Sequence, residues 1–219
     1  MTFRELQLLV SQGENLHVEF KHKLPEWPKL MREVVAFANT HGGTIWIGVD
    51  DDGTISGLRD PREIEEAIAL NLNEWVRPVP DWRLVVVPLS RKRAVVGIVV
   101  NRSLTKPHFA KESLIDEVGH ALIRIADSSV RASKEAVELL RYEGRERDMK
   151  VEYGDKERIL MQHIAVSKHI TVQEFADLAQ IARSSASRTL VHLVKSNVLY
   201  HRPLIDEEDR FYVKGKLGE

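Results

Sequence analysis

The sequence has 219 residues, of which 43% are hydrophobic and 30% are charged, a composition typical of a globular protein with a packed core. The formal net charge is −1, so the chain as a whole is not a basic, indiscriminate binder of polyanions. Cysteine is absent, which excludes disulfides, thiolate metal sites and thiol nucleophiles, and no apolar run approaches the roughly 18–20 residues that span a bilayer.

The hydrophobic pattern of the first two thirds of the chain alternates between helix and strand. It predicts helices over 3–10, 29–40, 61–72 and 134–142, the last of them capped by Ser133. It predicts strands over 16–21, 44–49, 83–89, 94–100 and 121–125. Gly42 and Gly43 end the second helix, and Asp51-Asp52-Gly53 forms a tight turn before a return strand that starts at 54–55. We therefore expect an α+β domain over 1–142, with a mixed sheet and packed helices, and a polar linker over 143–155.

Residues 156–219 follow a different order of elements: helix, helix, turn, helix and hairpin. The helices are expected over 156–166, 172–179 and 184–195, and the hairpin strands at 197–200 and 210–213. This order resembles the winged helix family. The resemblance implies a small winged helix-turn-helix domain behind the α+β domain, whose third helix reads the major groove of DNA.

The third helix of this module has one apolar side and one polar side. Helical spacing turns Ala186, Leu190, Leu193 and Val194 inward. The residues expected to contact DNA are Arg183, Ser184, Ser185, Ser187, Arg188, His192, Lys195 and Arg202. No acidic residue occurs between Ala179 and Ile205, which favours DNA, whereas the acidic block at 206–209 opposes it. The alternative is a winged helix used for dimerisation or protein contact.

Several motifs in the first domain carry a second family resemblance. Residues 14–21 read Glu-Asn-Leu-His-Val-Glu-Phe-Lys, residues 36–43 read Ala-Phe-Ala-Asn-Thr-His-Gly-Gly, and further matches are Gly53, Gly57-Leu58, Lys106-Pro107-His108 and Ile123-Arg124-Ile125. On these residues, region 5–142 resembles the Schlafen-type AlbA domain. The resemblance implies DNA binding or transcriptional regulation, the description of most microbial members, which often carry an attached helix-turn-helix.

The animal Schlafens of this family cleave RNA with three carboxylates, and the matching positions here are Glu14, Glu19 and Asp51. Three convergent carboxylates suit Mg²⁺ or Mn²⁺, which activates water at phosphorus. Lys21 shares a strand face with Glu19 and can hold a phosphate. The odd spacing of Glu14 and Glu19 requires a loop or bulge between them. The alternative is a surface Glu19–Lys21 ion pair and an ordinary acidic turn.

Other polar residues are assigned smaller roles. Arg91, Lys92 and Arg93 form a hairpin tip, which is either a solvated turn or a contact with a nucleic-acid backbone. Asn39 is expected to satisfy the end of its helix. The remaining candidates, His41, His108 and His120, lack metal-ligand spacing and are expected at the surface or in structural roles.

Three functional hypotheses follow. The first is a cytoplasmic, DNA-binding transcriptional regulator that needs no cofactor, acts as a homodimer and contacts no membrane. The second is a Mg²⁺- or Mn²⁺-dependent RNase or other nuclease that uses the three carboxylates and binds RNA or DNA. The third is a protein-interaction adaptor without affinity for nucleic acid.

Overall fold

A computed structural model describes residues 1–59, 61–143 and 153–214. The chain divides into two compact units, Met1–Arg131 (unit 1) and Ala132–Glu219 (unit 2). Most of the predicted linker, residues 144–152, lies outside the described residues, so its structure stays a prediction. No helix of the described residues is long and apolar enough to cross a membrane.

Unit 1 is built on a five-stranded mixed sheet. Its strands are β1 (Val18–Lys21), β2 (Gly43–Ile47), β3 (Leu58–Arg59), β5 (Trp82–Pro88) and β6 (Arg93–Val100). The order is β1-β2-β6-β3, with β5 also paired to β6. Strands β1 and β2 run parallel, and the other pairs are antiparallel, which confirms the expected α+β domain with a mixed sheet.

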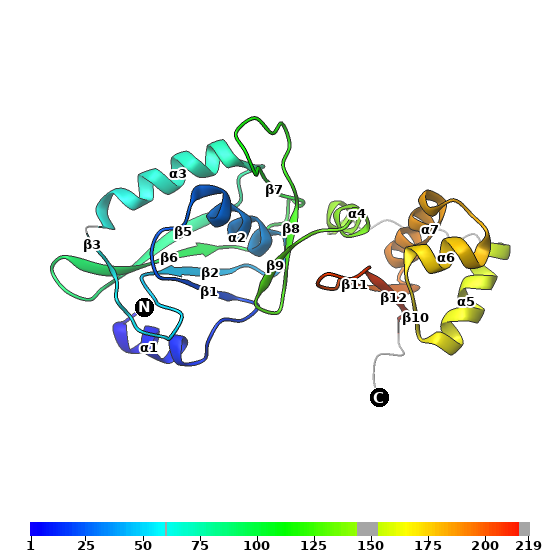
Figure 1. The fold of residues 1–219 in the computed structure, drawn as a ribbon, viewed down its shortest axis with the longest axis horizontal. Coiled ribbons are helices and arrows are strands. Elements are labelled where there is room, and N and C mark those ends of the chain that lie inside the picture. Colours follow the sequence, from blue (N-terminus) through cyan, green and yellow to red (C-terminus); the bar gives the residue numbers. More distant parts are fainter. Residues whose placement is uncertain (60, 144–152, 215–219) are drawn as a thin grey trace. The chain divides into compact units, whose positions relative to one another are not determined.

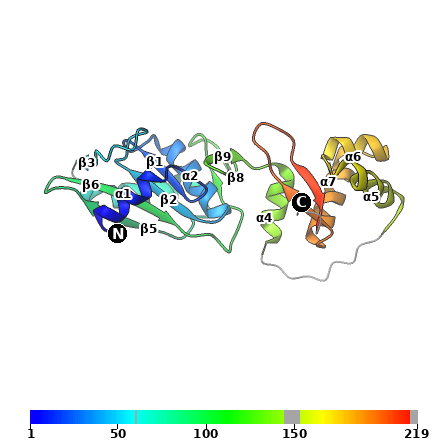
Figure 2. The same cartoon turned by 90° about the horizontal axis from the view of Figure 1, so that it is seen from below.

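Helices cover both faces of this sheet (Figure 1). Helix α1 (Phe3–Ser11), which starts with a capping box of Thr2 and Glu5, lies on one face, and Figure 2 shows it in front of the strands. Helices α2 (Trp27–Asn39) and α3 (Ile64–Trp75) lie on the other face. Each face has its own apolar core because β-strand side chains alternate between the two sides.

The end of α2 is fixed by glycine and by a buried amide. Gly42 has a φ of +75°, a conformation that favours glycine, and its N–H donates to the carbonyl of Phe37 at 2.8 Å. The prediction for Asn39 is wrong: its amide Nδ2 donates to the carbonyls of His108 and Leu122, both at 2.9 Å, instead of closing its own helix. Asn39 thus joins α2 to segments some 70–80 residues further along.

Short strands complete unit 1. Strand β4 (Val76–Arg77) pairs with β7 (Phe109–Ala110), and β8 (Leu122–Ile125) pairs with β9 (Ser128–Arg131). Of these, the sequence predicted only β8. The predicted turn after β2 is present, since the N–H of Gly53 donates to the carbonyl of Asp50, but the predicted return strand is a single bridge.

Unit 2 contains four helices and a small antiparallel sheet in its described residues. These are α4 (Lys134–Tyr142), α5 (Asp155–Ser167), α6 (Val172–Ala179) and α7 (Arg183–Lys195), with β10 (His169–Ile170), β11 (Leu199–Arg202) and β12 (Arg210–Val213) in the order β10-β12-β11. The inward residues predicted on α7 contribute to one core with Phe175 and Phe211. The arrangement is consistent with a winged helix.

Helix α4 belongs to unit 2. It was predicted as the end of the first domain, but it packs on α7 and buries Ala136 and Leu140. Its predicted cap is confirmed, because the hydroxyl of Ser133 accepts from the N–H of Ala136 at 3.0 Å.

Candidate functional site

The structure does not group the three predicted catalytic carboxylates, Glu14, Glu19 and Asp51, as a metal site would need. Val18 and Phe20 of β1 pack on the α1 side, so Glu19 points to the opposite side, toward α2. Glu19 is 95% buried, and its Oε2 accepts from Nη2 of Arg124 at 2.6 Å. Its other oxygen pairs with Lys21. The alternative expected a Glu19–Lys21 ion pair at the surface: the pair is present, but Glu19 is buried and Lys21 is half-buried.

Arg124 lies at the centre of a buried charge cluster. Its side chain is 0% exposed and also donates to Glu33 of α2 at 2.9 Å. Burial, followed by the charge of Glu19, raises the pKa of Glu33. Burial lowers the pKa of Lys21, but the hydrogen bond and charge of Glu19 outweigh it, so the net shift is upward. The negative charges of Glu19 and Glu33 and the positive charges of Lys21 and Arg124 thus compensate one another. The cluster therefore has a structural role.

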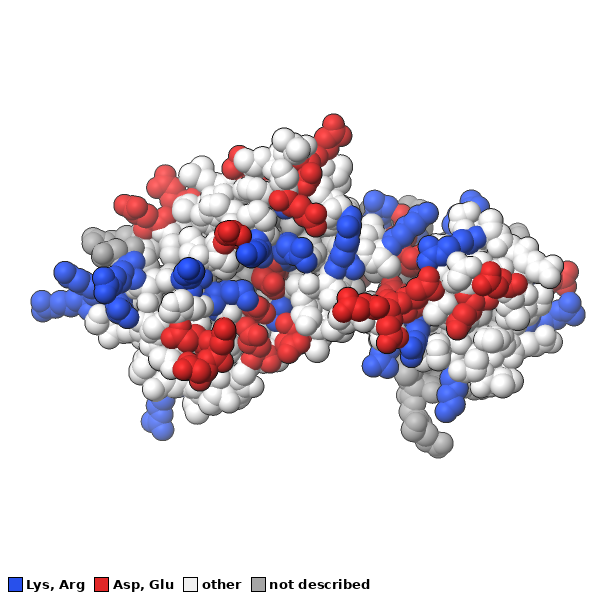
Figure 3. Space-filling view, in the orientation of Figure 1, with Lys and Arg blue, Asp and Glu red and all other residues white. Residues whose placement is uncertain are grey.

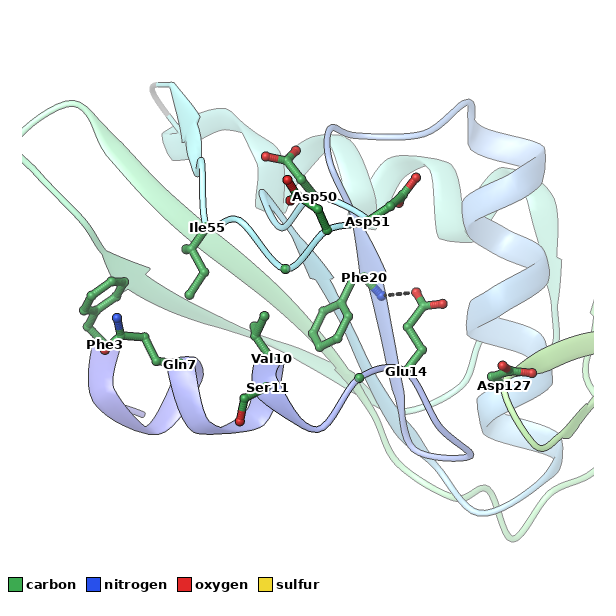
Figure 4. Close-up of a pocket in the computed structure, with 13 residues that line it drawn as sticks. Phe3, Gln7, Val10, Ser11, Glu14, Phe20, Asp50, Asp51, Ile55 and Asp127 are labelled. Carbon is green, nitrogen blue, oxygen red and sulfur yellow. Dashed lines mark hydrogen bonds between the residues drawn. The ribbon is translucent and has the colours of Figure 1, made fainter.

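The other two carboxylates line a cleft of about 910 Å³ on the α1 side (Figure 4). The cleft has five carboxylate residues along its lining: Glu14, Asp50, Asp51, Asp52 and Asp127. Glu14 sits in the loop before β1, as its odd spacing requires, and Oε1 accepts from the N–H of Phe20 at 2.7 Å. Asp50 also pairs with His22, a residue that the sequence did not single out.

The predicted metal site of Glu14, Glu19 and Asp51 is not formed. Among residues 1–59, 61–143 and 153–214, no three His, Asp or Glu side chains are grouped so as to hold a metal ion. The physical reason is the strand alternation that directs Glu19 into the cluster around Arg124 while Glu14 and Asp51 face the cleft. Lys21, predicted to hold a phosphate, is engaged by Glu19. These residues therefore do not fit Mg²⁺ or Mn²⁺.

The outer face of α7 presents part of the predicted DNA-binding set. Ser184 and Arg188 are exposed, and Ser185 and His192 are half-buried. The Arg188 Nε donates to the carbonyl of Ser184 at 3.3 Å, and no carboxylate of the described residues pairs with this guanidinium. Arg188 is therefore an available cation on the helix surface.

Two other members of that set, Arg183 and Lys195, are already engaged. Arg183 pairs with Glu208 of the β11–β12 hairpin at 2.8 Å, and both side chains are exposed. The Lys195 ammonium lies 5.2 Å from the centre of the Tyr142 ring. Arg202 ends β11 and is exposed.

Ser187 does not lie on the outer face as predicted. It is buried, and its hydroxyl donates to Glu135 of α4. The periodicity of α7 alone could not reveal this, because the surface that carries Ser187 is covered by a helix some fifty residues earlier in the chain.

The predicted basic hairpin tip is exposed, and the structure adds a residue to it. Arg91, Lys92 and Arg93 are exposed at the turn between β5 and β6. Arg59 of β3, which the sequence did not indicate, stands directly opposite Arg93 in the β3–β6 ladder. The sequence signal for Arg59 was weak, because a two-residue strand has no pattern to read. Figure 3 shows Lys and Arg gathered at this end of unit 1.

Comparisons with known proteins agree with the motifs of unit 1. The model of the family described as Schlafen, AlbA_2 matches residues 14–133. A comparison with curated protein sequences finds no match.

Two solved structures are similar to the chain. One is the N-terminal domain of a RecG-related protein from Nitrosomonas europaea, with 24% identity and a TM-score of 0.42, over 59% of this chain and 92% of that one. The other is the DIP2311 protein from Corynebacterium diphtheriae, with 16% identity and a TM-score of 0.44, over 85% of this chain and 37% of that one.

Proposed function

Because the chain belongs to the Schlafen AlbA_2 family, we propose that it is a nucleic-acid-binding protein that acts as a DNA-binding transcriptional regulator. The family match ends at residue 133, so we assign recognition of DNA to the winged-helix-like arrangement of unit 2. The observation that carries the proposal is Arg188, an exposed guanidinium on α7 without a carboxylate partner among the described residues.

The chemistry of this face suits a DNA groove. The N-terminal half of a recognition helix enters the major groove, where Arg188 can reach a guanine edge or a phosphate. Ser184 and Ser185 are small, so they permit close approach to the backbone and can donate to phosphate oxygens. Arg183, at the start of the helix, exchanges its partner Glu208 for a phosphate in this proposal.

The acidic block of the β11–β12 hairpin is partly compensated, which reduces its repulsion of DNA. Glu208 pairs with Arg183, and Glu207 pairs with Arg210 at 2.7 Å. The Asp209 carboxylate is mostly buried and accepts hydrogen bonds from Nε2 of His201 at 2.7 Å and from the hydroxyl of Ser133. The objection raised by the acidic sequence at 206–209 is weaker in the folded protein.

Binding to duplex DNA of random sequence, followed by fluorescence anisotropy at low salt, tests the proposal. The Arg188→Ala variant should bind about 1–3 kcal/mol more weakly than the wild type, because it loses a base or phosphate contact. Arg158→Ala is the matched control, since Arg158 is an exposed helical arginine already paired with Asp155 at 2.9 Å. Equal binding by wild type and Arg188→Ala, or no binding by the wild type, would contradict the proposal.

We also propose that the protein acts as a homodimer on palindromic sites. Regulators with a single recognition helix per chain commonly bind two half-sites about one helical turn apart through two-fold symmetry. Light scattering of the DNA complex should give two chains per duplex. A stoichiometry of one chain per duplex on a palindromic site would contradict this part of the proposal.

The nuclease alternative receives no support from the placement of its residues. Glu19 is bound to Arg124, whereas Glu14 and Asp51 line the cleft, of which Glu19 is not a lining residue. A protein-interaction adaptor is not favoured by any specific contact of the described residues, and the DNA-binding assay separates it from the regulator.

A further inference from the structure

Unit 1 has a second cationic surface, at the end of the β5–β6 hairpin. We infer that Arg59, Arg91, Lys92 and Arg93 form a sequence-independent binding surface for the phosphate backbone of a nucleic-acid duplex, separate from α7. The inference shares with the proposed function the premise that the ligand is a nucleic acid, and adds a contact made by unit 1 itself. Figure 3 shows this gathering of Lys and Arg.

The first argument is an unfavourable pairing within the sheet. Arg59 and Arg93 are directly opposite in an antiparallel ladder, where like charges destabilise the pair. No carboxylate of the described residues pairs with Arg59, Arg91, Lys92 or Arg93 to relieve that repulsion. Some other exposed arginines do have such partners, for example Arg141 with Glu138 and Arg158 with Asp155. A polyanion would supply the missing negative charge.

The second argument is the way the surface is held. Nη1 of Arg93 donates to the carbonyl of Ser56 at 2.7 Å, which ties the start of β6 to the segment before β3. Arg59, which pairs with Arg93 in the ladder, and Arg91 and Lys92 of the turn are exposed. The exposed guanidinium groups of Arg59 and Arg91 suit phosphate oxygens, which accept bidentate hydrogen bonds.

The third argument concerns the kind of ligand. Residues 56–59 and 88–93 include no aromatic side chain, so they provide no platform on which single-stranded bases can stack. They also include no exposed large hydrophobic side chain, which a membrane-binding loop would insert among the lipids. Cations without either feature match the backbone of a duplex, which is recognised by charge alone.

The test is a salt titration of the full chain on duplex DNA of random sequence and on duplex RNA of the same length. The triple variant Arg59→Gln/Arg91→Gln/Lys92→Gln keeps Arg93, whose bond to Ser56 is structural. The expected result is a slope of log K against log salt that is shallower by about 2–3, with at least tenfold weaker binding at low salt. A control triple, Lys29→Gln/Arg141→Gln/Arg158→Gln, removes the same charge from paired residues and should leave the slope unchanged.

The outcomes separate this inference from the proposed function. If Arg188→Ala weakens binding and the hairpin triple variant does not, the hairpin surface is overturned and the regulator proposal stands. If the hairpin triple variant alone weakens binding, unit 1 binds the duplex and the role of α7 fails. Equal effects of the hairpin and control triples, or binding to acidic lipid vesicles but to neither duplex, would overturn the hairpin surface. A difference between the DNA and RNA arms identifies which duplex it contacts.

Discussion

His108 is a motif residue whose role is structural. It is fully buried, and its Nδ1 lies 2.6 Å from the carbonyl of Pro78. Because a carbonyl only accepts, Nδ1 carries the proton, and Nε2 has no partner among the described residues. Burial lowers the pKa of His108, since the charged form would lose its hydration. Of the two positions expected for His108, at the surface or in a structural role, the structure supports the structural role.

This histidine should make the stability of unit 1 depend on pH. The unfolded chain takes up the proton near pH 6.5, whereas the folded protein resists it, so the contribution of His108 is full above about pH 6.5 and is lost as the pH falls. Urea unfolding on both sides of that pH should give a steeper loss for the wild type than for His108→Gln. Identical pH slopes for the two proteins would contradict the assignment.

Arg124 marks the limit of sequence reasoning at this scale. Its motif, Ile-Arg-Ile, correctly indicated a strand and membership of the family. Nothing local could show that the guanidinium turns inward between Glu19 and Glu33, because these partners are 105 and 91 residues away. Burial of a charge depends on its partners, so residues in such a cluster are interpreted correctly only once the tertiary contacts are known.

Among the elements, the long and periodic ones were predicted and the two-residue strands were not. The extent of α6, expected over 172–179, and the inward face of α7 followed directly from residue spacing. Strands β4, β7 and β10 have too few residues to show an alternation, and they form only because a neighbouring strand offers hydrogen bonds. The packing of α4 on α7 was missed because it is a contact between residues far apart in the sequence.

The contact between α4 and α7 should be measurable as stability. In Ser187→Ala, the buried carboxylate of Glu135 loses its hydroxyl donor, which should cost about 1–3 kcal/mol. Ser184→Ala, on the exposed face of the same helix, should change stability by less than about 0.5 kcal/mol. Hydrogen exchange of the α4 and α7 amides in the full chain measures the stability of each variant. Equal protection of these amides in Ser187→Ala and Ser184→Ala would contradict the role of Glu135.

At the scale of the whole molecule, the predicted and observed divisions of the chain differ in where α4 belongs. The hydrophobic pattern attached α4 to the first domain because it precedes the polar segment at 143–155. The described contacts place it in unit 2, where Ser133 and Tyr142 bond or contact residues of that unit at both ends of the helix. The position of a helix in the sequence therefore does not decide which unit it packs in.

This division predicts how fragments of the chain behave. A fragment of residues 132–219 should unfold cooperatively and at a higher temperature than one of residues 156–219, because only the longer one retains the buried side chains of Ala136 and Leu140. Circular dichroism melting curves of the two fragments provide the measurement. Equal melting temperatures would show that α4 contributes nothing to the fold of unit 2.

The alternation of β1 has a consequence for how unit 1 can diversify. On one side of the strand, Glu19 belongs to the buried charge cluster around Arg124, which also holds Glu33. In the cleft, Glu14 and Asp52 accept hydrogen bonds from the backbone N–H groups of Phe20 and Thr54, whereas Asp51 is exposed. The floor of the cleft includes Val10 and Phe20 of the buried core, so substitutions at an exposed rim position such as Asp51 should alter the charge of the hollow while leaving that core intact.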